Sequence, residues 1–104
     1  MEESRTAGNN FLKIRDTLQQ NKEELRRKYK VKSLGLFGSY IRGEQQQSSD
    51  IDILVEFYEN PGLIDFIALE YHLSELTGIK VDLVMKEALK PRIGERILRE
   101  VVPV

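Results

Sequence analysis

Two aspartates and a Gly-Ser pair are the residues of this sequence that point most directly to chemistry. Asp50 and Asp52 flank an isoleucine at the head of an apolar run, DIDILVEF, and Gly38-Ser39 ends an earlier apolar run. Side chains of a strand alternate between faces, so both carboxylates would lie on one face, about 6.5 Å apart along the strand. Two carboxylates held so close raise a pKa or require a cation between them. Mg²⁺ suits this role, because it binds carboxylates together with substrate phosphates.

A third carboxylate interrupts another apolar run. Asp82 stands in KVDLV, and strand alternation places it on the face opposite Val81 and Leu83. If the two runs are neighbouring strands, Asp82 joins Asp50 and Asp52. Three carboxylates on one open face can hold two metal ions.

The Gly-Ser pair and the residues after it suit phosphate. Gly38 allows a ligand to approach the backbone closely. Amides from Ser39 onward open a helical turn, SYIRGE, and helix N-termini bind phosphate. Arg42 is equally consistent with a phosphate contact and with an exposed position. A phosphate-binding turn beside a set of metal-binding carboxylates indicates a site for a nucleoside triphosphate with Mg²⁺.

Each of these features also has a plain structural interpretation. Charges such as D-x-D protect edge strands from pairing, and Gly-Ser pairs mark turns. Glu56 shares the face of Asp52 but lies farther along the strand, which favours a surface role. His72, the only histidine, is expected to be a packing or surface residue, and Tyr40 is compatible with base stacking or with core packing.

The elements that would position these residues alternate along the chain. Their order is α-β-(α)-β-α-β-α, which predicts an α/β (α+β) fold with helices packed on a mixed sheet of three or slightly more strands. A helical crossover makes the second and third strands parallel, whereas the short link between the first two favours antiparallel pairing. The predicted elements are a loose tail over 1–8, a helix over 10–29 capped by Asn9 or Asn10, strands Val31–Phe37, Asp50–Phe57 and Lys80–Met85, a loop Gly43–Ser49, and helices Leu63–Thr77 and Pro91 towards Val101.

In two of the predicted helices, the sequence pattern does not show what the apolar residues pack against. In the helix Leu63–Thr77 the predicted apolar face is formed by Leu63, Phe66, Ile67, Leu73 and Leu76. Further apolar residues, Tyr71 among them, indicate either burial on two sides or a protein interface. The last helix has a predicted stripe of Ile93, Ile97, Leu98 and Val101.

Composition narrows the functional class. The chain has 104 residues, which predicts one domain over residues 1–104. A net charge of -1 argues against general nucleic-acid binding, and the absence of cysteine excludes thiol chemistry. No run approaches the roughly 20 apolar residues of a membrane helix, and no signal peptide is visible, so a cytoplasmic location is expected.

The spacing of these residues resembles a known family. Gly38-Ser39, ten residues and then Asp50-Ile51-Asp52 look like the G-S-x10-D-x-D signature of the polymerase-β-like nucleotidyltransferase superfamily. GSYIRGEQQQSSDIDILVEF resembles more narrowly the minimal nucleotidyltransferases of prokaryotes, the MntA-type proteins. The similarity continues through KVDLV and the C-terminal KPRIGERILREVVPV.

The resemblance implies a nucleotidyltransferase palm that uses ATP with Mg²⁺. It implies that Gly38 and Ser39 contact the triphosphate and that Asp50, Asp52 and Asp82 bind the metals. Members of this family are typically paired with a HEPN-domain toxin, to which the nucleotidyltransferase, as antitoxin, adds AMP. Two alternatives stay open: an antitoxin that acts by binding alone, and a transferase acting on a small molecule or an RNA end. A homo-oligomer is a further option, because the small chain leaves a pocket wall to be supplied by a second copy.

Overall fold

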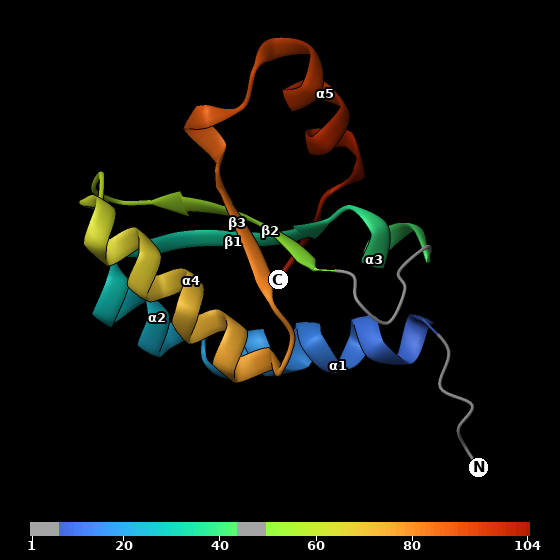
Figure 1. The fold of residues 1–104 in the computed structure, drawn as a ribbon, viewed down its shortest axis with the longest axis horizontal. Coiled ribbons are helices and arrows are strands. Elements are labelled where there is room, and N and C mark those ends of the chain that lie inside the picture. Colours follow the sequence, from blue (N-terminus) through green and yellow to red (C-terminus); the bar gives the residue numbers. More distant parts are fainter. Residues whose placement is uncertain (1–6, 44–49) are drawn as a thin grey trace.

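A four-stranded mixed sheet organises the molecule. The structure is a computed structural model that describes residues 7–43 and 50–104 (Figure 1). The strand order is β3-β2-β1-β4. β1 is antiparallel to both β2 and β4, and β2 is parallel to β3, which confirms the predicted mixed sheet. The strands are β1 (Val31–Phe37), β2 (Ile51–Phe57), β3 (Val81–Met85) and β4 (Val102–Pro103). β4 was not predicted, because two residues are too few to show a periodicity.

The alternation expected along β2 is present. Ile51, Ile53 and Val55 are fully buried, whereas Asp52 and Glu56 are partly exposed on the opposite face. The buried face packs against α1, α2 and α4, which lie together on one side of the sheet (Figure 1). This placement of the core leaves the aspartate face of the sheet for the site. The predicted loop Gly43–Ser49 lies, apart from Gly43, outside the described residues.

The N-terminal helical segment is two helices, α1 (Ala7–Gln20) and α2 (Lys22–Tyr29). The prediction of one helix over 10–29 was therefore wrong, as were the caps at Asn9 or Asn10 and a tail reaching residue 8. Asn21 interrupts the helix with φ −103° and ψ 6°, and its side-chain amide donates to the Thr17 carbonyl at 2.8 Å. Asn side chains compete with helical backbone bonds in this way, which explains the break.

The helix α4 (Leu63–Thr77) has its predicted bounds and ends at Gly78, which has φ +74°. Its buried residues are Leu69 and Leu73. The predicted apolar face was partly wrong, because Leu63 is 74% exposed and Ile67 is 51% exposed. Within the described part of the chain, no helix is long and apolar enough to cross a bilayer.

Side chains of α4 hold the edge strand β3 in place. Ser74 Oγ accepts a hydrogen bond from the Val81 amide, and Glu70 Oε2 accepts one from the Leu83 amide, both at 3.0 Å. These bonds satisfy edge amides that would otherwise be open to pairing with another chain. They also flank Asp82 and so fix the part of β3 that carries it.

The last helix, α5 (Pro91–Glu100), stands on the opposite side of the sheet from α1, α2 and α4 (Figure 1). It follows a short 3₁₀ turn, η1 (Lys86–Ala88). The predicted apolar stripe is only partly covered, since Ile93 is 59% exposed and Leu98 is 47% exposed. The chain after α5 is better anchored: β4 pairs with β1, and the Val104 amide donates to the Leu34 carbonyl at 3.0 Å.

Candidate active site

The sheet register brings the predicted carboxylates together. Asp52 on β2 pairs with Asp82 on β3 and, on its other side, with Phe37 on β1. Asp50 immediately precedes β2. The site is thus built on the middle of the sheet, where parallel pairing with β3 and antiparallel pairing with β1 converge on Asp52.

Gly38 packs directly against the Asp52 carboxylate. It follows β1 and precedes the short helix α3 (Ser39–Arg42), with φ +86° and ψ −154°. A Cβ on Gly38 would lie 2.9 Å from Asp52 Cγ and would overlap Oδ2. Glycine is therefore required at this position for two reasons. The backbone conformation is unfavourable for other residues, and Asp52 occupies the space where a side chain would begin.

The Asp52 carboxyl resists ionisation. Its pKa is raised to about 6, first by burial and then by the negative charges of Asp82, Asp50 and Glu100, which Arg42 offsets in part. Burial and neighbouring like charges disfavour the ionised form of a carboxyl group, and groups with pKa values shifted in this way are common at functional sites.

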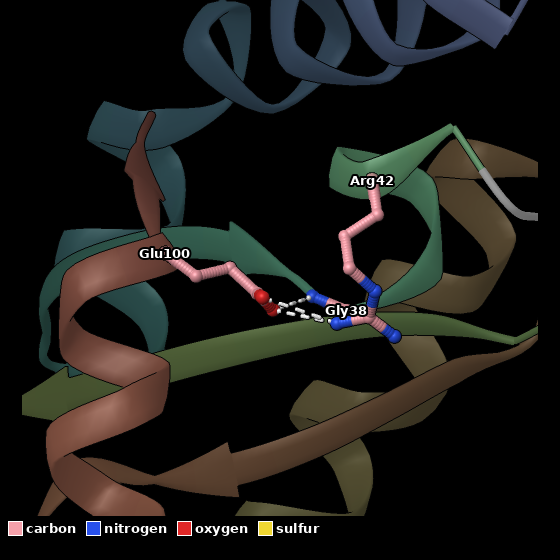
Figure 2. Close-up of polar contacts among 3 residues, drawn as sticks. All are labelled: Gly38, Arg42 and Glu100. Atoms are coloured by element: carbon pink, nitrogen blue, oxygen red, sulfur yellow. Dashed lines mark hydrogen bonds and ion pairs between the residues drawn. The ribbon is translucent and has the colours of Figure 1, made fainter.

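A contact that the sequence did not indicate joins α5 to the Gly-Ser turn. Glu100 Oε2 accepts a hydrogen bond from the Gly38 amide at 2.8 Å. Both Glu100 oxygens also lie 3.1 Å from Arg42 Nη1 (Figure 2). These bonds, with the positive charge of Arg42, hold the pKa of Glu100 below its usual value. Arg42 is exposed, as one of the two interpretations expected, and its guanidinium is paired with a carboxylate.

The one sequence signal for Glu100 was weak. It lies three residues after Ile97 and seven after Ile93, so it shares their helix face. A carboxylate in line with an apolar stripe indicates a buried or paired acid. Its partners are 62 and 58 residues away in sequence, however, and no local pattern identifies them.

The remaining residues singled out in the sequence are placed as follows. Ser39 begins α3 and is partly exposed, whereas Tyr40 belongs to the core, which favours packing over base stacking. Glu56 accepts a hydrogen bond from Ser33 and forms ion pairs with Lys32 and Lys86, as a surface residue does. His72 lies with its ring centroid 5.7 Å from that of Tyr29, in a packing role.

The carboxylates fit a hard divalent cation by their chemistry. Asp50, Asp52 and Asp82 offer only oxygen donors. Burial, and then repulsion by the other two carboxylates, raise the Asp52 pKa, and a bound cation would oppose that repulsion. Among the described residues, no three acidic or imidazole groups are already gathered into a complete ligand set.

The mixed α/β sheet has a D-x-D pair at the start of β2 and a glycine turn packed on the second aspartate, which is the arrangement expected from the nucleotidyltransferase signature. The chain matches the family described as Nucleotidyltransferase domain over residues 18–104, and it belongs to that family. Nucleotidyl transfer is therefore its class of enzymatic activity.

Similar proteins include minimal members of this family. The chain is 52% identical over 89 residues to Protein adenylyltransferase MntA of Thermococcus cleftensis, covering 86% of this chain and 90% of that protein. A solved structure described as a putative minimal nucleotidyltransferase has a TM-score of 0.73 at 31% identity, over 99% of this chain and all (100%) of that one. A toxin-antitoxin crystal structure with AMP-PNP has a TM-score of 0.67 at 26% identity, over 82% of this chain and 70% of that chain.

Proposed function

We propose that this protein transfers AMP from ATP, with Mg²⁺, to a hydroxyl group of a partner protein, and that it serves as the antitoxin of a HEPN-domain toxin. The observation that carries the catalytic part is the Asp52 carboxylate, held against Gly38, opposite Asp82 and with its pKa raised to about 6. The partner is supported by the similarity to the Thermococcus protein adenylyltransferase and to the toxin-antitoxin structure.

The residues of the chain have distinct roles in this proposal. Asp50, Asp52 and Asp82 would hold Mg²⁺, which neutralises phosphate charge and acidifies the acceptor hydroxyl when bound. The absence of a side chain at Gly38 lets the nucleotide approach the backbone, and the Ser39 hydroxyl donates to a phosphate oxygen. Arg42 adds positive charge near the phosphates.

The transfer itself is a substitution at the α-phosphorus. The acceptor oxygen forms a bond to the α-phosphorus while the bond to the pyrophosphate oxygen breaks. Asp82 accepts the proton of the hydroxyl as general base. Most of the rate enhancement then comes from positioning and from fixed charges around the phosphates.

The proposal is tested with ATP radiolabelled at the α-phosphate. The purified protein is incubated with Mg²⁺ and a lysate of its source cell, beside an Asp50→Asn/Asp52→Asn double variant. We expect a labelled protein band with the native chain only, and its mass identifies the acceptor. Labelled small molecules or RNA without a labelled protein would contradict protein modification. Binding of ATP without any transfer would contradict catalysis and favour an antitoxin that acts by binding.

The exposed side of α4 gives a prediction about the partner. Tyr71 is 74% exposed, close to the exposed Ile67 and Ile64. Tyr71→Ala is expected to leave the melting temperature nearly unchanged and to weaken toxin binding, because large exposed apolar residues commonly form interfaces. The control is Leu69→Ala on the buried side, which should cost about 2–5 kcal/mol of stability. Calorimetry and a toxin-binding titration measure the two effects, and unaltered toxin binding by Tyr71→Ala would exclude this surface.

A further inference from the structure

Glu100 holds two groups that suit a phosphate. A phosphate oxygen and a carboxylate oxygen are both anionic acceptors that take hydrogen bonds from backbone amides and from guanidinium groups. The Gly38 amide and the Arg42 guanidinium both donate to the Glu100 carboxylate (Figure 2). The residues proposed to face the triphosphate are therefore already engaged by an anion of the same chain.

The negative charge of Glu100 lowers the affinity of the site for a nucleotide. Glu100 and Asp52 both contact Gly38: Glu100 accepts a hydrogen bond from the Gly38 amide, and the Asp52 carboxylate packs where a Gly38 side chain would begin. A triphosphate entering beside Glu100 would meet a fourth carboxylate and an arginine whose charge is already offset. Like charges placed together at a binding site lower affinity.

The helix that carries Glu100 is weakly held. Gly94 is the one buried residue of α5, and Ile93 and Leu98 are about half exposed. A solvent-open pocket of about 150 Å³ is lined by Leu98 and Val101 at the end of the helix and by Leu54 of the sheet. Elements with few buried apolar contacts open at low free energy. Because β4 and Val104 stay fixed to β1, Val101 is the point at which α5 would turn.

We propose that the Glu100 carboxylate is an internal competitor of the triphosphate, and that α5 must withdraw it from Gly38 and Arg42 before a nucleotide binds. This inference rests on the proposed nucleotide site. It makes α5 a gate: whatever stabilises the withdrawn helix raises nucleotide affinity, and whatever presses α5 onto the sheet lowers it.

The test compares Glu100→Gln with Glu95→Gln. Glutamine keeps an acceptor oxygen for the Gly38 amide but removes the negative charge. Glu95 lies on the same helix and is exposed, so its variant makes the same charge change away from the Gly38 turn. Calorimetric titration with Mg-ATP should show about tenfold tighter binding by Glu100→Gln and little change in Glu95→Gln.

A second measurement uses the native chain. Hydrogen exchange of the peptide covering residues 97–101 should become faster when Mg-ATP is added, because α5 leaves the sheet. Unchanged or weaker ATP binding by a folded Glu100→Gln variant would overturn the competitor role, and a loss would show that Glu100 positions Gly38 and Arg42 instead. Slower exchange at residues 97–101 would also overturn it. Failure of both native chain and variant to bind ATP would overturn the proposed function, and this inference with it.

Discussion

Replacing Asp52 with asparagine is expected to abolish nucleotidyl transfer and to make the folded protein more stable. The loss should be at least about 10²–10³ in rate, because a charged group at the reacting phosphates is removed without a change of shape. Loss of Arg42 should cost less, since Mg²⁺ held by the aspartates would supply most of the positive charge at the phosphates. Transfer of labelled AMP to the partner measures both.

The gain in stability follows from the Asp52 pKa. The folded value of about 6 lies above the ordinary value of 3.8, so the native state holds the proton more tightly than the unfolded chain does. Stability from this group is therefore fully present below pH 4 and is lost as the pH rises through 6. Asparagine resembles the protonated carboxyl and does not ionise, so the Asp52→Asn protein does not lose this stability as the pH rises.

The size of that gain is limited by solvent. The Asp52 side chain is partly exposed, so screening reduces the effect to about 1–2 kcal/mol above pH 7. For a chain of this size, about 1 kcal/mol raises the melting temperature by about 4–8 °C. Thermal melts from pH 4 to pH 8 should show the two proteins converging at low pH. An Asp52→Asn protein that is less stable at pH 8, or fully active, would contradict this account.

Gly38→Ala is expected to disrupt both the fold and the site. The alanine Cβ would overlap the Asp52 carboxylate, and φ +86° is unfavourable for any residue with a side chain. We expect a loss of about 2–4 kcal/mol in the free energy of unfolding and no measurable transfer. Denaturant titration and the labelling assay measure these losses.

The matched control is Gly78→Ala at the end of α4. Gly78 has a similar φ of +74°, but a Cβ there meets no atom within 4 Å. Its cost should be about 1 kcal/mol, from backbone strain alone. In an Asp52→Ala background Gly38→Ala should cost less, because most of the overlapping atoms are absent. Equal costs at Gly38 and Gly78 would show that the contact with Asp52 is unimportant.

Much of the fold and the main residues of the candidate site could be predicted from local sequence patterns. β1 and α4 have their predicted bounds, and β2 and β3 begin one residue later than predicted. A period of two along β2 separated Asp52 from the core residues, and a long helical link predicted the parallel pairing that places Asp82 beside it. Local pattern succeeds here because strand alternation and crossover geometry depend on neighbours in the sequence.

The rest depended on contacts between distant segments. The apolar residues of α4 do not say which of them will be covered; the packing of α4 on the sheet selects Leu69 and Leu73 and leaves Leu63 exposed. The engagement of Gly38 and Arg42 by Glu100 requires α5 to fold back across the sheet after β3, through a link whose course has no periodic signal. Alternation and spacing indicated which residues could form the site. The packing of α5 decided which charge faces the Gly-Ser turn, because a carboxylate pairs with whatever donors the fold brings within hydrogen-bond distance of it.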